Sequence, residues 1–176
     1  MDGSPSENAN PVATVVVVAW NGAAFLGACL DALERQEIDA HYTTWVIDNA
    51  SSDDTATLAA RHPTAARVVR LQRNIGFAGA IALAMEEART PIVVILNQDA
   101  VVAPDWLAAL LEPLADPAVA AVTSKVLLER DGNLNNTGVL IAPDGYGIDR
   151  GFGEPDDGRY GLAEDVFAFS GTAAAV

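Results

Sequence analysis

The clearest structural signal in the chain is the stretch 12–36, which reads VATVVVVAWNGAAFLGACLDALERQ. Its first eight residues are almost all apolar and β-branched, as in a strand that is buried on both faces of a parallel sheet. The pair Asn21-Gly22 favours a turn. Between positions 23 and 36 apolar residues recur every three or four positions, which predicts a helix with one buried stripe. A strand followed by such a helix is the opening unit of an α/β fold.

The same alternation recurs along the next hundred residues. Further strands are expected at 44–48, 67–71 and 92–96, and further helices at 53–61, 76–89 and 104–114. Strand character returns over 119–128, whereas 131–161 is rich in Gly, Asp, Asn and Pro and is expected to form loops and short strands. The sequence therefore predicts an α/β fold with a mostly parallel central sheet and helices on both faces.

Length, composition and charge narrow the classes of protein. The 176 residues are 51% apolar, enough for one globular domain, and the formal net charge is −14. So acidic a chain, without a run of Lys or Arg, is not expected to bind nucleic acid. We expect a disordered tail over 1–11 with no features of a signal peptide, no transmembrane segment, and a cytoplasmic location.

The residues most often used for thiol or zinc chemistry are few. Cys29 is the single cysteine and falls on the apolar stripe of the first predicted helix, so we expect it in the core. His41 and His62 have no Cys or carboxylate at zinc-ligand spacing and are interpreted as surface histidines.

Polar residues follow four successive predicted strands. They occupy 20–22, 48–52, 73–76 and 97–99. Each group also has a structural interpretation as a turn or helix cap. Because ligands of open parallel sheets bind beyond the carboxyl ends of the strands, the four groups together favour a ligand site at that edge.

Asp99 is the most informative member of this set because it follows a wholly apolar strand. A carboxylate at the rim of the sheet is an oxygen ligand for Mg²⁺ or Mn²⁺, although it could also cap the next turn. A divalent cation would let so acidic a protein hold a diphosphate.

The sequence lacks the residues of two common phosphate-binding loops. No Walker A lysine loop is present, and residues 76–79 lack the G-x-G-x-x-G spacing after a first strand. A Gly-rich basic loop of the kind expected in a sugar nucleotidyltransferase is also missing after the first predicted strand.

Four motifs together resemble the family 2 glycosyltransferases, which have the GT-A nucleotide-diphospho-sugar fold, and in particular their rhamnosyltransferase-like branch. They are VVVVAWNG at 15–22, VIDNASSDDT at 46–55, RNIGFAGA at 73–80 and ILNQD at 95–99, in the family's order and spacing. A looser match extends through Arg150-Gly151 and 169–171.

The resemblance implies a nucleotide-sugar donor site, with Asp48 accepting a hydrogen bond from a pyrimidine base and Asp99 ending the family's Asp-x-Asp metal motif. The metal would be Mg²⁺ or Mn²⁺. The implied donor-binding residues are Trp20, Asn21, Asp48, Asn49, Arg73, Asn74, Gly76, Asn97 and Gln98.

The chain departs from the family pattern in three ways. Asn97 replaces the first Asp of the metal motif, and Ala82 stands where many relatives carry Asn. The family's general base, in a Glu-Asp pair well after the Ser-Gly segment, is expected beyond Val176, so the chain is expected to be truncated. Glu164-Asp165 is an alternative pair, but it precedes Ser170-Gly171.

The resemblance thus predicts a donor-binding domain at 12–128 and the start of an acceptor-side region at 129–176. The expected function is inverting, metal-assisted transfer of a hexose from a UDP- or dTDP-sugar, dTDP-rhamnose included, to a hydroxyl. A glycan or lipid-linked acceptor is implied, in cell wall or polysaccharide biosynthesis, and a lipid-linked one would place the enzyme peripherally at the inner membrane face. The alternative is a nucleotide-sugar binding module without catalysis.

Overall fold

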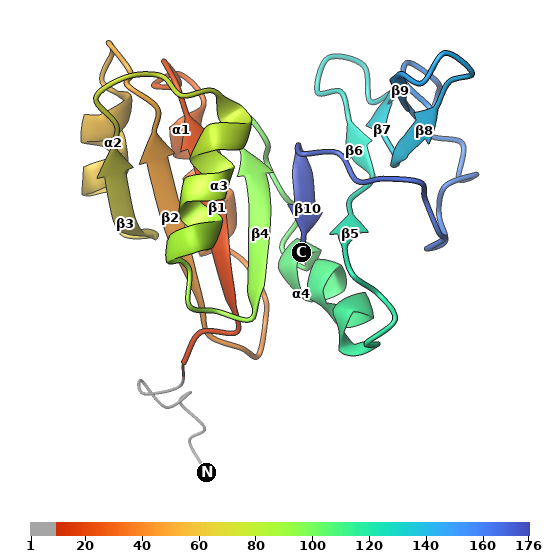
Figure 1. Ribbon diagram of the computed structural model, residues 1–176, viewed down its shortest axis with the longest axis horizontal. Helices are drawn as coiled ribbons and strands as arrows, with labels where there is room; N and C mark the ends of the chain where they lie inside the picture. Colours follow the sequence, from red (N-terminus) through yellow and green to blue (C-terminus); the bar gives the residue numbers. More distant parts are fainter. Residues whose placement is uncertain (1–9) are drawn as a thin grey trace.

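The computed structural model describes residues 10–176, and the predicted tail at 1–11 lies almost entirely outside this range. A six-stranded sheet forms the centre of the molecule, with strand order β3-β2-β1-β4-β10-β5 (Figure 1). Two small two-stranded sheets, β6-β7 and β8-β9, lie beside it. The elements are β1 (Ala13–Ala19), α1 (Leu26–Glu34), β2 (Tyr42–Asp48), α2 (Thr55–Arg61), β3 (Ala65–Arg70), α3 (Phe77–Glu87), β4 (Ile92–Asn97), α4 (Trp106–Leu111), the 3₁₀ helix η1 (Glu112–Ala115), β5 (Val122–Thr123), β6 (Val126–Leu127), β7 (Leu134–Asn136), β8 (Val139–Ile141), β9 (Gly147–Asp149) and β10 (Ala173–Ala175).

The first four strands run parallel to one another. β1 pairs with β2 on one side and with β4 on the other, and β3 pairs with β2. β10 is antiparallel to both β4 and β5. The prediction of a mostly parallel sheet in an α/β fold is therefore confirmed, and the carboxyl ends of the four parallel strands meet at one edge.

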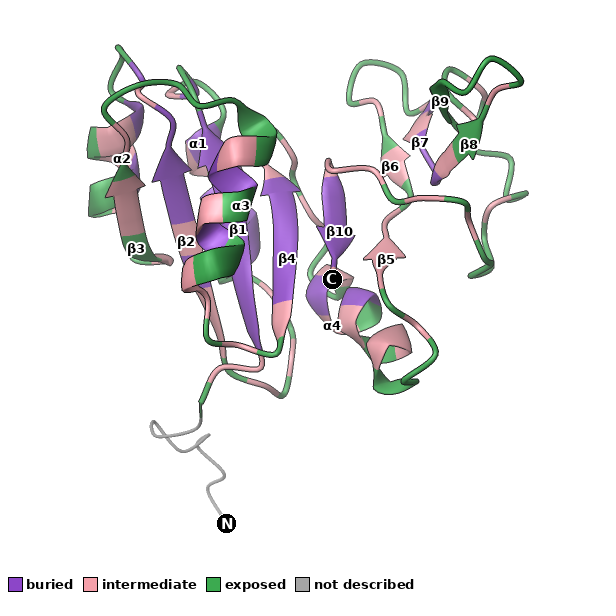
Figure 2. Cartoon of the chain, viewed as in Figure 1, coloured by how far each residue is buried: buried purple, intermediate pink, exposed green. Residues whose placement is uncertain are grey.

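Helices cover both faces of the sheet, as predicted, because successive residues of β1 point to opposite sides. Val15 and Val17 face the helices α1 and α4, while Val16 and Val18 face α3. Every residue of β1 is buried, and Figure 2 shows the central strands as the most buried part of the molecule. This rigid centre positions the loops at the carboxyl edge.

Several predicted element bounds are wrong in detail. The first helix begins at Leu26 instead of position 23, since residues 23–25 form a turn. The strand predicted at 119–128 is broken into β5 and β6, which belong to different sheets. The strand β10 was not predicted, because alanines carry no β-branched signal and its partners β4 and β5 lie far away in the sequence.

Candidate functional site

A cavity of about 380 Å³ opens at the carboxyl edge of the parallel strands. Its lining comes from the ends of β1, β2 and β4, from the loop before α3 and from the first residue of α3. The structure brings seven of the predicted site residues to this cavity, together with two others. The lining residues are Val18, Trp20, Asn49, Asn74, Gly76, Phe77, Asn97, Gln98 and Asp99.

Asn21, Asp48 and Arg73 were predicted for the site but do not line the cavity. Asn21 has a left-handed backbone, with φ +48°. Its side-chain Oδ1 accepts a hydrogen bond from the Ser52 N–H at 2.9 Å, and its own N–H donates to Ser51 Oγ at 2.9 Å. Asn21 therefore ties the turn after β1 to the turn after β2.

Asp48 lies directly beneath this edge at the end of β2 and is fully buried. One carboxylate oxygen, Oδ1, accepts a hydrogen bond from the Ser51 N–H at 3.0 Å. The other, Oδ2, is buried without a hydrogen bond, and Arg70 Nε lies 3.4 Å from it. A buried carboxylate oxygen with unused acceptor capacity is uncommon and requires an explanation.

The loop between β3 and α3 is held to β2 by the side chain of Asn49, which is 2% exposed. Its Oδ1 accepts a hydrogen bond from the Ile75 N–H at 2.9 Å, and its Nδ2 donates to the Gly76 carbonyl at 3.2 Å. Within the loop, Asn74 Oδ1 accepts from the Gly76 N–H at 2.8 Å. The polar groups of the Asn49 side chain thus bind the loop and hold it to β2.

Arg73 extends from the same loop. It is exposed, and among residues 10–176 no acidic group forms an ion pair with it. A guanidinium free of acidic partners beside this edge is a cation available to an anionic ligand.

Asp99 is exposed on the turn that follows β4 and is the one acidic residue in the lining of the cavity. Cys29 is buried, as predicted, and its Sγ is 3.5 Å from the carbonyl oxygen of Asn97, two residues before Asp99. Burial, with a smaller contribution from the charge of Asp99, raises the pKa of the Cys29 thiol to about 12. Cys29 is therefore a protonated core residue at neutral pH and not a nucleophile.

The donor set at the cavity fits a cation shared with a phosphate ligand. Asp99 offers a carboxylate and Asn97 an amide oxygen, both of the type that Mg²⁺ and Mn²⁺ prefer. One carboxylate is too few for a site made wholly of protein ligands. It is sufficient where phosphate oxygens and water complete the coordination, as is usual for Mg²⁺ with nucleotides.

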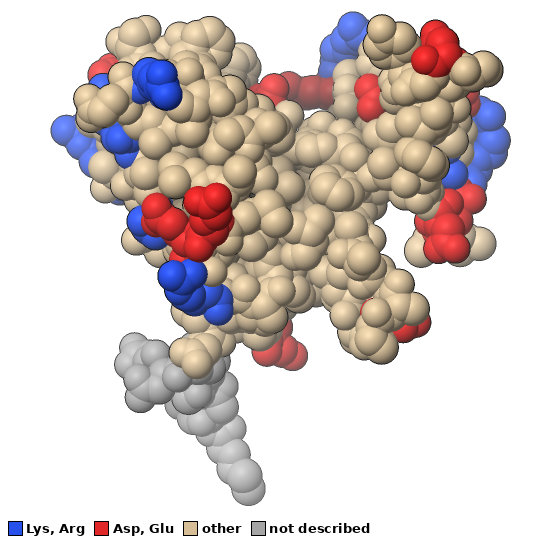
Figure 3. Space-filling model, viewed as in Figure 1, with Lys and Arg blue, Asp and Glu red and all other residues tan. Residues whose placement is uncertain are grey.

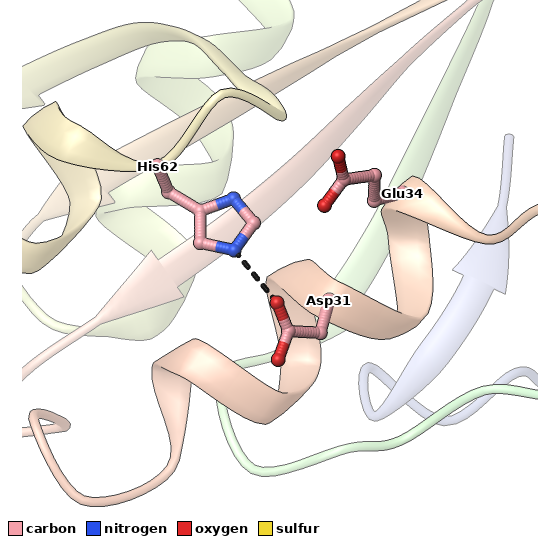
Figure 4. A group of neighbouring side chains, drawn as sticks. All are labelled: Asp31, Glu34 and His62. Atoms are coloured by element: carbon pink, nitrogen blue, oxygen red, sulfur yellow. Dashed lines mark hydrogen bonds and ion pairs between the residues drawn. The ribbon is translucent and has the colours of Figure 1, made fainter.

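A second group of potential ligands lies away from this cavity, between α1 and the end of α2. Asp31, Glu34 and His62 place one ligand atom each within 4.8 Å of one another (Figure 4). His41 is exposed, as predicted, whereas His62 is only partly exposed: its side chain is 13% exposed, and its Nε2 lies 3.1 Å from Asp31 Oδ1. Because Nδ1 accepts a hydrogen bond from the Thr64 N–H, the neutral ring carries its proton on Nε2, which opposes metal binding there.

The alternative pair Glu164-Asp165 lies elsewhere. Both residues line a different, larger groove of about 890 Å³ beside β5, and Glu164 forms an ion pair with Arg150 at 2.8 Å. Neither residue lines the cavity that contains Asp99.

Phe77 lines the cavity but was not among the predicted site residues. It is 41% exposed, and Trp20 at the opposite loop is 54% exposed. Two exposed aromatic rings beside a polar cavity are suited to contact a flat or apolar ligand surface. The available signal was an aromatic residue directly after a glycine at the start of a predicted helix.

Figure 3 shows charged side chains of both signs in small groups on the visible face, without a broad basic patch. Among residues 10–176, no helix combines the length and the apolar character needed to cross a membrane.

Comparison with solved structures identifies proteins of the same fold. A mannosyltransferase from Pyrobaculum calidifontis, solved with GDP-Man and Mn²⁺, is 34% identical with a TM-score of 0.60, over 74% of this chain and 39% of the other. Glucosyl-3-phosphoglycerate synthase from Mycobacterium tuberculosis is 24% identical with a TM-score of 0.56, over 64% of this chain and 43% of the other. These neighbours confirm the predicted GT-A fold.

Comparison with curated sequences also identifies glycosyltransferases. Uncharacterized glycosyltransferases of Mycobacterium tuberculosis and Mycobacterium bovis are 40% identical over 91 residues, which is 52% of this chain and 38% of each relative. The matched region thus spans little more than a third of the length of these relatives. The model of the family described as "Glycosyl transferase family 2" matches residues 14–169, nearly the whole chain, and the chain therefore belongs to glycosyltransferase family 2.

Proposed function

We propose that this chain binds a nucleoside diphosphate sugar and serves in the metal-assisted transfer of its hexose to a hydroxyl acceptor with inversion. One observation carries the proposal: a single carboxylate, Asp99, lines a cavity at the carboxyl edge of the parallel strands, and Asp48 at the end of β2 has a buried oxygen without a hydrogen bond. The Asp99 carboxylate suits a cation bound to a diphosphate, and the Asp48 oxygen suits an N–H of a base.

The base of the donor is assigned to the side of the cavity formed by β2. Oδ2 of Asp48 makes no hydrogen bond and faces Arg70 Nε at 3.4 Å, and it would accept a hydrogen bond from a ring N–H, which uracil and thymine both offer. We therefore propose a UDP- or dTDP-sugar, with dTDP-rhamnose as one candidate. Guanine also carries a ring N–H, and the Pyrobaculum calidifontis neighbour was solved with GDP-Man, so GDP is the competing donor nucleotide.

The diphosphate is assigned to the side formed by β4. Asp99 and Asn97 would hold Mg²⁺ or Mn²⁺, which would stabilise the negative charge that develops on the leaving diphosphate. Arg73, free of acidic partners, would contribute a second positive charge from the loop before α3. In a protein of net charge −14, these are the groups that would make the site attractive to an anion.

The acceptor side is proposed at 129–176 and in the parts of longer relatives outside the matched region. An inverting transfer needs a base that removes the proton of the incoming hydroxyl. Asp99 is the one carboxylate in the lining of this cavity and is assigned to the cation, so we place the base outside that lining, and we propose a carboxylate beyond Val176 for it. A glycan or a lipid-linked glycan is the proposed acceptor.

A second candidate function is nucleotide-sugar binding without transfer. It is favoured by the neutral Asn97 and by the absence of a second carboxylate among the lining residues of the cavity. Release of nucleoside diphosphate from a donor sugar in the presence of hydroxyl acceptors would support catalysis. Donor binding without release would support the binding module.

The binding step is tested by thermal unfolding with UDP, dTDP or GDP, each with and without Mn²⁺. Nucleotide at 100 times its Kd adds about 2.7 kcal/mol of stability, or roughly 5–10 °C in Tm for a domain of this size. The Asp99→Asn variant should lose the Mn²⁺-dependent part of that shift. Asp105→Asn, which changes an exposed aspartate outside the cavity lining, is the matched control and should keep it. A wild-type protein that shows no shift with any of the three nucleotides would overturn the proposal.

A further inference from the structure

The side chain of Gln98 lies against the backbone of the turn after β1. Its Oε1 accepts a hydrogen bond from the Trp20 N–H at 3.0 Å, and its Nε2 donates to the Trp20 carbonyl at 3.2 Å. The regular pairing of β1 with β4 ends one step earlier, at Val18 and Asn97. The amide of Gln98 thus makes the two bonds that the peptide of a neighbouring strand would make, and extends the contact between the two strands.

Gly22 leaves the space that this amide occupies. A Cβ at position 22 would lie 1.9 Å from Gln98 Oε1, 2.5 Å from its Cδ and 3.1 Å from its Nε2. These three atoms are the nearest neighbours of that position, so the closest steric contact of an added Cβ would be with the Gln98 side chain. The backbone of Gly22 does not have the positive φ that would itself favour glycine.

Asp99, by contrast, depends on its backbone for its position. Its carboxylate forms no ion pair with any residue in 10–176. The turn that carries it is closed by the Ala100 N–H, which donates to the Asn97 carbonyl at 3.2 Å, and is anchored to β1 by Gln98. Loss of the Gln98 amide would leave that turn without its bonds to the turn after β1.

We propose that Gln98 is a positioning residue, which holds the Asp99 carboxylate beside the turn at 20–22 for the cation, and that Gly22 is required to admit its amide. This inference rests on the proposed function, since it assigns a task within the same site. It reassigns Gln98 from donor contact, the role implied by the resemblance, to support of the metal ligand. Groups that orient a metal ligand commonly change metal affinity about 10–100-fold when removed.

The contact itself is tested by a double-mutant cycle on stability, which needs no ligand. Gly22→Ala should lower Tm by about 2–4 °C in the wild-type background, because the added methyl displaces the flexible end of Gln98 and its two exposed hydrogen bonds are lost, at a cost of about 1 kcal/mol. In the Gln98→Ala background, where the colliding atoms are gone, the same substitution should have little effect. Gly27→Ala is the matched control, since its Cβ would meet only Leu58 Cδ1 at 4.0 Å and should cost nothing in either background. Additive effects of Gly22→Ala and Gln98→Ala would overturn the contact.

The positioning role is tested by calorimetric titration of nucleotide, UDP, dTDP or GDP, with and without Mn²⁺. In Gln98→Ala the affinity measured with Mn²⁺ should fall about tenfold, while the affinity measured without metal should stay unchanged. A merely structural role would move both affinities together. Gln98→Glu keeps the acceptor for the Trp20 N–H and should retain part of the Mn²⁺ effect; it also serves if Gln98→Ala does not fold.

The outcomes separate the two claims. If the wild-type protein binds none of the nucleotides, the proposed function fails, and the role of Gln98 in it fails as well. If the wild-type protein shows Mn²⁺-dependent binding and Gln98→Ala and Gln98→Glu show the same dependence, the positioning role alone is wrong.

Discussion

Replacement of Asn49 by alanine should destabilise the protein and release the loop before α3. The structure gives the Asn49 side chain two hydrogen bonds to that loop, at 2.9 Å from the Ile75 N–H and 3.2 Å to the Gly76 carbonyl. At about 1 kcal/mol net for each bond, Asn49→Ala should lower the free energy of unfolding by about 2 kcal/mol. For a domain of this size that is a decrease of roughly 4–8 °C in Tm.

Two further variants sharpen this test. Asn49→Asp keeps an acceptor for the Ile75 N–H but places a carboxylate oxygen against the Gly76 carbonyl, so it should be no more stable than Asn49→Ala. Asn135→Ala is the control for the general effect of replacing an asparagine by alanine, because the Asn135 side chain makes no hydrogen bond to the loop.

The assays are urea unfolding, which gives the global change, and amide hydrogen exchange, which follows the Ile75 N–H directly. Exchange at Ile75 should accelerate in Asn49→Ala because its acceptor is gone. A Tm within 1 °C or so of the wild type, combined with unchanged exchange at Ile75, would refute the assignment of Asn49 as the brace of this loop.

Three other predictions follow from the same edge of the sheet. The pKa of Cys29 is raised from 9.0 to about 12, so the folded state keeps its thiol proton to a higher pH than the unfolded state. The free energy of unfolding should therefore fall as the pH rises from 9 toward 12. Urea unfolding at several pH values should show a weaker fall in Cys29→Ala. The pKa of Asp53 is lowered from 3.8, chiefly by the hydrogen bond from the Thr55 hydroxyl. Its contribution to the free energy of unfolding is therefore present above pH 3.8 and is lost as the pH falls through the lowered pKa. Acid unfolding of Asp53→Asn, followed by circular dichroism, should depend less on pH in that range than acid unfolding of the wild type. Gly76 has φ +78° and ψ 165°, a backbone conformation that essentially only glycine adopts, and there is open space around its Cβ position. Gly76→Ala should therefore cost about 1–3 kcal/mol through backbone strain alone, and an unchanged Tm would contradict this.

The arrangement of the sheet could be predicted because its signals are local. The β-branched run of β1 and the periodic apolar stripe of α1 each indicate one element, and their alternation indicates a parallel sheet. Because parallel strands have their carboxyl ends at one edge of the sheet, the residues after four strands were predicted to lie together. The structure brings Trp20, Asn49 and Asp99 to one cavity at that edge. Strand β10 could not be predicted, since its pairing with β4 joins segments about 80 residues apart.

The contacts inside the site could not be predicted from residue types alone. The sequence shows that 20–22 and 97–99 carry polar residues, but not that the Gln98 amide bonds to the Trp20 backbone or that Asn21 bonds to Ser52. Likewise, His62 is separated from Asp31 by 31 positions, so the hydrogen bond between them depends on how α1 packs beside α2. These contacts depend on tertiary geometry, which the spacing of residues along the chain does not contain.

The proposed donor site depends most on the placement of a divalent cation by Asp99. The most direct measurement is a crystal structure of the protein grown with Mn²⁺ and a nucleoside diphosphate, with an anomalous difference map that locates the manganese. We expect one peak within coordination distance of the Asp99 carboxylate, with the diphosphate on its other side and the base toward Asp48. Manganese at Asp31, Glu34 and His62 instead, or a nucleotide bound at the cavity with no metal near Asp99, would contradict this expectation.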